Sequence, residues 1–434
     1  MNKHLKNLDL YFSSDCNLNC KYCYIYKNKE KLQKYNEEIL NNISNKKYAN
    51  NVINKFKNYK NDIESIGLWG AEPTLNSFKA KELLTDLFDY FLNIKRLFFS
   101  TNGVIGIDGI KPYIDFISNY NKLNNRDIKL EIQFSIDGDA NITNNNRGEQ
   151  VYYYVISSIK KTVEYCANKE DCCTINIKVK PTLTIDNIKY LIQDDSKLIN
   201  WYLTFDNLYE QNKQYESDKL KLNLLGYPTL VNPDIYTVED GKIFSSFIEK
   251  ISNLKEEYFI NYKHPLILQP LSCFKKELFN RSLNIPGFGA CSAGRGSCSV
   301  DKDGNIHSCH RFFNYMPLPQ EGLEPLNNYY NIKTESQRDK MDMANAVYHN
   351  NFYSRFEFFT IIAQALAKYG FIDKIYLDNK NNLLILFCLT ESLMCHFGQA
   401  EETKDLFIAQ TGYIKLFGNG AAQNLMKYIR RYDL

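Results

Sequence analysis

The segment Ser13-Ser14-Asp15-Cys16-Asn17-Leu18-Asn19-Cys20-Lys21-Tyr22-Cys23-Tyr24 places three cysteines within eight residues. It follows an apolar run at 8–12 that predicts a strand. A loop this short can bring three thiolates around one metal centre but supplies no fourth ligand. Structural zinc sites are closed by four protein ligands, whereas a reactive centre keeps one position open. The segment therefore fits a [4Fe–4S] cluster that is held by Cys16, Cys20 and Cys23 and leaves one iron free for an external ligand.

This cysteine spacing, with Tyr22 just before the third cysteine, resembles the signature of the radical S-adenosylmethionine (SAM) superfamily. The resemblance implies that SAM binds the open iron and that Tyr22 belongs to the cofactor-binding loop. The residues alone leave two other interpretations open, namely a zinc site that borrows a distant ligand and a set of buried free thiols. A motif stays a hypothesis until its structural context agrees.

Composition narrows the class of protein and its location. The 434 residues are 44% hydrophobic and 24% charged, which is typical of a globular protein. The formal net charge of +3 is too near neutral to indicate nucleic acid as a partner. The first residues lack the apolar core of a secretion signal, and no apolar run approaches membrane-spanning length. We therefore expect a cytoplasmic protein with no membrane partner, in which the twelve cysteines serve ligation and chemistry rather than disulfides.

The first half of the chain alternates short apolar runs with longer helical patterns, which is typical of parallel βα units. About six such units predict an α/β fold, a partial (β/α)6 TIM-type barrel whose chemistry lies at the carboxyl ends of the strands. The predicted strands are Leu8–Phe12, Ser65–Trp69, Arg96–Ser100, Lys129–Ile136, Ile175–Thr184 and Trp201–Phe205. The predicted helices between them are Glu37–Tyr59, Phe78–Leu92, Gly109–Leu123, Val151–Cys166 and Ile185–Ile199.

The second predicted strand ends in Trp69-Gly70-Ala71-Glu72-Pro73-Thr74-Leu75. Gly70 allows close approach of a ligand to the backbone, Glu72 can accept from an ammonium group, and Pro73 fixes the exit of the chain. The segment resembles the Gly-Gly-Glu-Pro stretch with which the superfamily holds the amino group of SAM. Ala71 stands where the family has its second glycine, and alanine is the smallest substitute.

The third and fourth predicted strands end in polar residues. Phe99-Ser100-Thr101-Asn102-Gly103 closes one, and Gln133-Phe134-Ser135-Ile136-Asp137-Gly138 closes the other. The resemblance assigns hydroxyl and amide groups here to SAM and pairs Arg147 with the carboxylate of SAM. Each residue also has an ordinary structural interpretation. Asn-Gly alone is a common turn, and an arginine in a loop is usually just exposed to solvent. Leu183 could contact the adenine of SAM or belong to the hydrophobic core. The cofactor-binding residues implied in this region are Ser100, Asn102, Ser135, Asp137, Arg147 and Leu183.

A second cysteine cluster lies far downstream. Cys291 and Cys298 precede Asp303-Gly304, a strong hairpin signal that folds Cys309 back towards them. The pattern Cys-x12-Gly-x4-Cys resembles the opening of the SPASM or Twitch module of radical SAM maturases. That resemblance implies one auxiliary [4Fe–4S] cluster on Cys291, Cys298, Cys309 and Cys395, with Cys388 as the alternative fourth ligand. The later cysteine run of a full SPASM module is missing, and a zinc site from the same groups stays open.

Two further sets of residues have weaker assignments. His310 follows Cys309 at the position of an acid in sulfatase-maturating relatives, so it is a candidate base, and a structural role is an equal alternative. The cysteines at 166, 172 and 173 lie away from the strand carboxyl ends and are interpreted as incidental. Cys273 has no informative spacing.

The expected organisation has three parts. Residues 1–205 form the radical SAM partial barrel, and 206–288 form a bridging segment that is either part of a lid or ordinary connecting structure. Residues 289–434 form the SPASM/Twitch-like α+β auxiliary iron–sulfur module and a C-terminal helical region. Within the bridging segment, Thr237 and Asp240 predict a capping box for a helix from Val238.

The resemblance implies an enzyme in which a 5′-deoxyadenosyl radical abstracts hydrogen from a ribosomal peptide or protein side chain. The product is a thioether or carbon–carbon crosslink or another modification. The implied partners are a peptide or protein substrate and an external electron donor such as flavodoxin or ferredoxin. No room for an N-terminal leader-recognition domain is expected, so a separate leader-recognition protein is a further candidate partner. The alternatives are a radical SAM enzyme that acts on a small molecule and a non-catalytic metal-binding scaffold.

Overall fold

The structure of the chain is a computed structural model, and it describes only part of the 434 residues. The described residues are 5–23, 29–224, 229–230, 237–258, 297–301, 303–307, 361, 364–365 and 367–369. The chain divides into two compact units. The first comprises Met1–Pro181, Asn200–Gly226 and Ala293–Asn327, and the second comprises Thr182–Ile199, Tyr227–Ser292 and Asn328–Leu434.

The first unit is built on one eight-stranded sheet in the order β10-β9-β1-β2-β3-β4-β5-β7. All neighbouring strands pair parallel except β10, which pairs antiparallel with β9. The strands are β1 (Asn7–Ser13), β2 (Ser65–Gly70), β3 (Arg96–Thr101), β4 (Lys129–Phe134), β5 (Ile175–Val179), β7 (Leu220–Asn223), β9 (Ser297–Val300) and β10 (Ile306–His307). The predicted α/β class and its parallel sheet are therefore confirmed.

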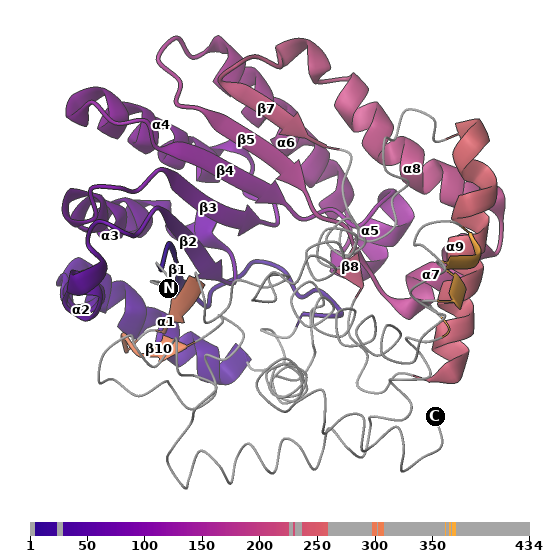
Figure 1. The fold of residues 1–434 in the computed structure, drawn as a ribbon, viewed down its shortest axis with the longest axis horizontal. Helices are drawn as coiled ribbons and strands as arrows, with labels where there is room; N and C mark the ends of the chain where they lie inside the picture. Colours follow the sequence, from indigo (N-terminus) through magenta and orange to yellow (C-terminus); the bar gives the residue numbers. More distant parts are fainter. Residues whose placement is uncertain are drawn as a thin grey trace, which may run out of the picture. The chain divides into compact units, whose positions relative to one another are not determined.

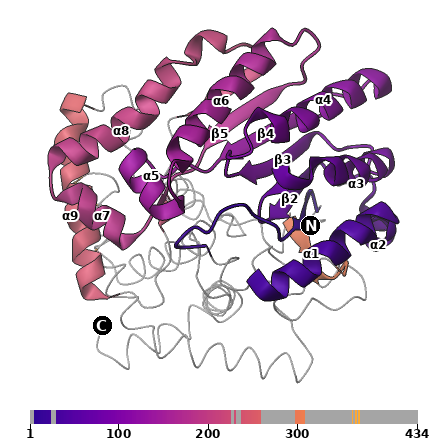
Figure 2. The same cartoon turned by 180° about the vertical axis from the view of Figure 1, so that it is seen from behind.

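Helices connect successive strands and lie side by side along one face of the sheet, as Figures 1 and 2 show for α2, α3 and α4. Parallel strands need such crossover connections because a tight turn cannot join them. The helical elements of this unit are α1 (Lys29–Ser44), α2 (Lys47–Phe56), η2 (Lys57–Tyr59), η3 (Pro73–Asn76), α3 (Ser77–Tyr90), α4 (Ile107–Asn124), α5 (Ala140–Arg147), α6 (Val151–Asn168) and η4 (Lys213–Tyr215). Helix α8 (Asp195–Glu210) begins in the second unit and continues into the first.

The two faces of the sheet differ in polarity, and among the described residues the helices α2, α3 and α4 lie along one of them (Figure 1). One row of residues in register across six neighbouring strands is buried and apolar apart from one cysteine, and it consists of Cys298, Leu8, Ile66, Leu97, Leu130 and Ile175. Full burial of a leucine or isoleucine side chain contributes about 1.5–3 kcal/mol. This face is the core of the first unit.

The opposite face of the sheet carries polar and aromatic side chains. Glu131 of β4 accepts from Arg96 of β3 at 2.9 Å and pairs with Lys178 of β5 at 2.8 Å. Gln133 donates to the hydroxyl of Ser100 at 2.9 Å. Along β3, β4 and β5, buried residues therefore alternate with less buried ones.

The second unit contains a short parallel pair, β6 (Thr182–Leu183) and β8 (Thr229–Leu230), and the helices α7 (Ile185–Ile192) and α9 (Val238–Tyr258). The predicted capping box of α9 is confirmed, since the amide of Asp240 donates to the Thr237 hydroxyl and the Thr237 amide to the Asp240 carboxylate. Among the described residues, no helix has the length and apolar character to cross a membrane.

Two predicted strands are corrected by the structure. Trp201–Phe205 lies in α8, because Trp201, Tyr202 and Phe205 recur at helical spacing and pack one buried face. The edge strand is β7 instead, whose residues alternate between buried and exposed. The predicted strand Ile175–Thr184 is two strands, β5 and β6, separated by Lys180 and Pro181. Proline has no backbone N–H, so it cannot donate a hydrogen bond to a neighbouring strand.

Candidate active site

The segment that carries Cys16, Cys20 and Cys23, residues 14–23, is called the cysteine loop. It follows β1 at the carboxyl edge of the sheet and is hydrogen-bonded to the end of β2. The amide of Ala71 donates to the carbonyl of Ser13 at 2.8 Å, and the amide of Glu72 donates to the carbonyl of Asp15 at 2.9 Å. This approach requires glycine at 70, where φ is 125° and an added Cβ would lie 1.8 Å from the Ser13 carbonyl oxygen. The Gly70 segment thus fixes where the cysteine loop begins.

Alanine at 71 fits this arrangement without strain. Ala71 is not among the non-glycine residues with positive φ. Its backbone N–H donates to the Ser13 carbonyl at 2.8 Å, a bond that a residue with a Cβ makes here without adopting a positive φ.

A buried polar cluster anchors the other end of the cysteine loop. The carboxylate of Asp137, at the end of β4, is fully buried and accepts from the Tyr22 hydroxyl at 2.8 Å. It also accepts from Arg147 Nε at 3.0 Å and from one terminal Arg147 nitrogen at 2.8 Å. The Arg147 guanidinium lies 5.4 Å from the centre of the Tyr22 ring. Tyr22 therefore ties the loop to the residues that follow β4.

Helix α5 completes this anchor. The amide of Lys21 donates to the carbonyl of Asn146 at 2.9 Å, and the Asn146 side chain donates to Asp137 at 3.0 Å. Burial raises the pKa of the Tyr22 hydroxyl well above its usual value, so the phenol stays protonated and donates its hydrogen bond. Both backbone and side-chain bonds thus hold the loop between 20 and 23 against α5.

Glu72 is turned into the protein rather than towards open space. Its side chain is 1% exposed. The carboxylate accepts from the Thr74 amide and hydroxyl at 3.1 and 2.6 Å, from the Thr101 hydroxyl at 2.8 Å and from the Asn102 amide at 2.6 Å. These bonds join the end of β2 to the end of β3, and burial raises the pKa of Glu72.

Asn102 connects the end of β3 to the first cysteine. Its side-chain amide donates to Asn17 Oδ1 at 2.8 Å and reaches Cys16 Sγ at 3.7 Å. The Leu18 amide also donates to Cys16 Sγ at 3.4 Å. Two N–H groups therefore donate to Cys16 Sγ. These hydrogen bonds stabilise the thiolate form of Cys16, which is the form that binds metals.

The three cysteines lie on one loop, are free thiols and are half-buried. Burial raises the pKa of Cys16 to about 12 and that of Cys20 to about 11, so a bound cation must supply the charge that keeps them as thiolates. Among the described residues, no three Cys, His, Asp or Glu side chains converge on one ion position. A [4Fe–4S] cluster does not need such convergence, because each cysteine thiolate binds a different iron atom. Three thiols along one short loop therefore suit a cluster.

The other predicted site residues fall in several places. Pro73 begins η3, where its carbonyl accepts from the Tyr113 hydroxyl at 2.8 Å. Ser100 and Ser135 are half-buried at the ends of β3 and β4, and Leu183 is buried in β6 of the second unit. Six predicted or considered residues lie outside the described part of the chain, namely Cys273, Cys291, Cys309, His310, Cys388 and Cys395.

Of the predicted auxiliary-cluster ligands, only Cys298 is described. It lies in β9 opposite Leu8 of β1, is fully buried, and burial raises the pKa of its thiol well above the usual value. The predicted hairpin is confirmed, since β9 and β10 pair antiparallel and the Gly304 amide donates to the Asp301 carbonyl at 2.9 Å. The hairpin extends the main sheet beside β1.

Sequence reasoning missed three residues that hold the site together. Thr101 binds Glu72, Asn146 binds Asp137, and the indole N–H of Trp201 donates to the Asp137 carbonyl at 2.7 Å. Thr101 could have been found as another polar residue at a strand carboxyl end. Asn146 and Trp201 carry no such signal, because their roles depend on tertiary packing.

Comparison with known proteins finds a family model that matches the amino-terminal part of the chain. Residues 10–194 match the family model described as "Radical SAM superfamily". No curated protein matches the chain at a significant level. A solved structure of native anSMEcpe with bound AdoMet is similar at 15% identity and a TM-score of 0.48, over 98% of this chain and 99% of that one. A structure of native anSMEcpe with bound AdoMet and Cp18Cys peptide is similar at 15% identity and a TM-score of 0.47, over the same shares of the two chains.

Proposed function

We propose, from the membership of residues 10–194 in the radical SAM superfamily, that this enzyme modifies a side chain of a peptide or protein. The cluster and SAM, when bound, supply a 5′-deoxyadenosyl radical that takes a hydrogen atom from the substrate. Cys16, Cys20 and Cys23 would hold the cluster. The modification we infer is a thioether or carbon–carbon crosslink or a related change of a side chain.

One observation carries the cluster assignment. The cysteine loop is fixed at both ends to the carboxyl edge of a parallel sheet, through Gly70 at its start and through Tyr22 and Asp137 at its end. Catalytic groups of parallel βα folds lie at this edge. A loop that served only to pack the core would need neither the buried charge of Asp137 nor the Tyr22, Asn146 and Arg147 side chains that donate to it.

The residues around the loop have separate roles in this proposal. Backbone groups of 70–72 lie beside the start of the loop, where they can meet the polar end of SAM. Asn102 places an amide next to Cys16 and can hydrogen-bond a neighbouring ligand. Arg147 holds Asp137 with two of its nitrogens, which leaves its remaining N–H groups for an anion such as the SAM carboxylate.

Peptide or protein substrates are favoured over small molecules by the downstream motif. Cys291, Gly304 and Cys309 have the spacing that resembles SPASM or Twitch modules of maturases. In support, Gly304 forms the tight turn of a described hairpin with φ of 77°. We infer one auxiliary [4Fe–4S] cluster on Cys291, Cys298, Cys309 and either Cys395 or Cys388. His310 is then a candidate base next to that cluster, and flavodoxin or ferredoxin is a suitable electron donor.

The function is tested by anaerobic reconstitution with iron, sulfide, SAM and reductant. We expect 5′-deoxyadenosine from the wild type and none from the triple variant Cys16→Ala/Cys20→Ala/Cys23→Ala. A matched control removes three cysteines from the other edge of the sheet, Cys166→Ala/Cys172→Ala/Cys173→Ala, and keeps the activity. Equal 5′-deoxyadenosine from wild type and the first variant would rule the proposal out, and none from either would favour a scaffold.

The substrate class is tested separately. Short cysteine-rich peptides encoded near the gene are incubated with the reduced enzyme and examined by mass spectrometry. A mass loss of two hydrogens per crosslink supports peptide modification. Turnover of SAM that is stimulated only by a small molecule, with every peptide unchanged, would favour the small-molecule alternative.

A further inference from the structure

The side-chain amide of Asn102 lies beside the first cysteine of the cysteine loop. Its nitrogen is 3.7 Å from Cys16 Sγ and 2.8 Å from Asn17 Oδ1. The amide nitrogen carries two hydrogens, so it can donate one to each acceptor. The bond to sulfur is the longer one because the sulfur atom is larger than oxygen. Asn102 therefore donates to the cysteine without giving up its bond to Asn17.

The direction of this amide is fixed by the oxygen at the end of the same side chain. Asn102 Oδ1 accepts from the Val104 amide at 2.9 Å, in a turn that is typical of asparagine. A flipped side chain would place its N–H groups against the Val104 N–H and its oxygen against Asn17 Oδ1. Only the orientation with the nitrogen towards Cys16 satisfies all of these groups.

The backbone of Asn102 is held from both sides. Its amide donates to the buried Glu72 carboxylate at 2.6 Å, and the Thr101 hydroxyl donates to the same carboxylate at 2.8 Å. The Gly103 amide donates to the Thr101 hydroxyl at 3.0 Å, and Gly103 has a φ of 71°, which favours glycine. The Asn102 amide is thus a preorganised donor, which need not move when the charge that it faces changes.

Cys16 Sγ also accepts from the backbone amide of Leu18 at 3.4 Å. Any residue except proline at position 18 would supply that donor. Asn102 supplies its donor from the side chain. The residue at position 102 therefore decides whether the sulfur has one N–H donor or two.

Reduction of a [4Fe–4S] cluster changes the charge that these donors face. In the proposed function, an external donor such as flavodoxin or ferredoxin gives one electron to the cluster, whose net charge becomes more negative by one. An N–H group stabilises the sulfur of the reduced cluster more than that of the oxidised cluster, because the sulfur then carries more negative charge. Hydrogen bonds to the sulfurs are among the features that set the potential of such clusters.

We propose that Asn102 is a positioning residue that raises the reduction potential of the cluster through its hydrogen bond to Cys16. The inference rests on the proposed cluster on Cys16, Cys20 and Cys23, and it deepens that proposal by naming a residue that governs how easily the electron enters. The hydrogen bond involves only groups of this chain, so its effect is expected in enzyme to which no SAM has been added.

The test is a redox titration of the reconstituted, SAM-free enzyme, followed by electron paramagnetic resonance. Asn102→Ala removes the donor. Asn102→Asp replaces it with a negatively charged acceptor and keeps an oxygen for the Val104 amide. We expect the midpoint potential to fall from wild type to Asn102→Ala and further to Asn102→Asp. Loss of the donor should shift the reduction equilibrium roughly tenfold, which is about 59 mV for one electron.

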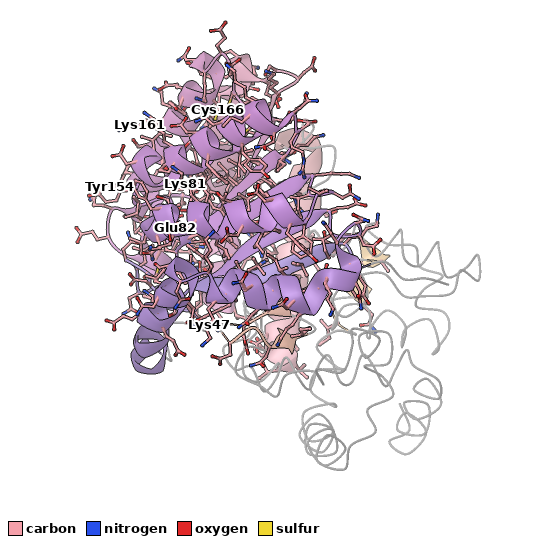
Figure 3. The ribbon with its side chains drawn as sticks, turned by 90° about the vertical axis from the view of Figure 1, so that its left-hand side faces the viewer. Lys47, Lys81, Glu82, Tyr154, Lys161 and Cys166 are labelled. Atoms are coloured by element: carbon pink, nitrogen blue, oxygen red, sulfur yellow. The ribbon has the colours of Figure 1, made fainter. Side chains whose placement is uncertain are left out.

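Two controls separate the hydrogen bond from other effects. Asn17→Ala removes the other acceptor of the Asn102 amide and keeps the bond to Cys16. Lys161→Gln changes the net charge by the same amount as Asn102→Asp, but on the exposed surface of α6, where Figure 3 labels Lys161 and where salt screens the charge. Both controls should keep the wild-type potential.

The proposal would be overturned by equal midpoint potentials in the wild type, Asn102→Ala and Asn102→Asp at the same iron content. A shift in Asn17→Ala as large as that in Asn102→Ala would also overturn it, because the effect would then come from the shape of the cysteine loop.

A measurement that needs neither Asn102 variant covers the case in which those variants bind no cluster. The protein is prepared with asparagine that carries the heavy isotope of nitrogen only in its side chain, and the reduced, SAM-free enzyme is examined by pulsed electron paramagnetic resonance. We expect a coupling between this nitrogen and the cluster that persists in Asn17→Ala, and its absence would overturn the proposal. A wild type that binds no iron would refute the proposed function, and this inference with it.

Discussion

The guanidinium of Arg147 meets the carboxylate of Asp137 side-on, with Nε at 3.0 Å from one oxygen and a terminal nitrogen at 2.8 Å from the other. Both side chains are almost completely excluded from water. This pair lies beneath Tyr22, so the position of the cysteine loop depends on a buried charge pair that local sequence does not reveal.

Removing the charge of Asp137 should strongly destabilise the protein. Asp137→Asn keeps the size of the side chain but leaves Arg147 as a buried, uncompensated cation, which costs about 3–5 kcal/mol. We expect a corresponding fall in the free energy of unfolding measured with denaturant. The control is Asp171→Asn, which removes an exposed partner of Lys122 and should cost less than about 1 kcal/mol. Equal effects of the two variants would show that Asp137 does not anchor the loop.

Gly70 and Ala71 provide a matched test of the backbone at the site. Gly70→Ala places a Cβ against the Ser13 carbonyl at a positive φ, so we expect loss of cluster binding and reduced stability. Ala71→Gly relieves no strain and should keep both within error. The measurements are iron content after anaerobic reconstitution and thermal unfolding. Normal iron content in Gly70→Ala would contradict the close approach of β2 to the cysteine loop.

How far the sequence predicts this protein depends on the range of the interactions. Strands such as Ser65–Gly70 and the turn at Gly304 follow from local patterns, and the cysteine motif follows from spacing alone. The prediction of a strand at Trp201–Phe205 was wrong because a short apolar run is compatible with both a helix and a buried strand. The inward orientation of Glu72 and the pairing of Arg147 with Asp137 depend on contacts between different βα units, which no local pattern encodes.

Glu72 should make stability depend on pH in a defined direction. Burial raises its folded-state pKa above the usual 4.5, so the folded protein binds this proton more tightly than the unfolded chain. The contribution is fully present below the unfolded pKa and is lost as pH rises through the folded pKa. Between these values the free energy of unfolding should fall by up to about 1.4 kcal/mol per pH unit.

Glu72→Gln isolates this titration. The variant cannot ionise, so the difference in free energy of unfolding between wild type and variant should change across this pH window and be flat below it. A difference that is independent of pH from 4 to 8 would show that Glu72 has an unshifted pKa. If the wild type instead became more stable relative to Glu72→Gln as the pH rises, the pKa of Glu72 would be lowered by folding rather than raised.

Iron content tests the auxiliary cluster. Two cubanes give about eight irons per chain and one gives about four. We expect about eight for the wild type and for Cys273→Ala, and about four for Cys291→Ala, Cys298→Ala and Cys309→Ala. Unchanged iron in Cys298→Ala would assign this fully buried residue to the core beside Leu8. A content of about one zinc and about four irons per chain would show that the downstream cysteines bind zinc rather than an auxiliary cluster.

Electron paramagnetic resonance of the reduced, oxygen-free enzyme tests whether the cluster on Cys16, Cys20 and Cys23 keeps one iron open for SAM. We expect a reduced [4Fe–4S] signal that changes when SAM is added and that is absent from Cys16→Ala/Cys20→Ala/Cys23→Ala. A signal that is present in the wild type but unaltered by saturating SAM, or zinc in place of iron at these cysteines, would contradict it.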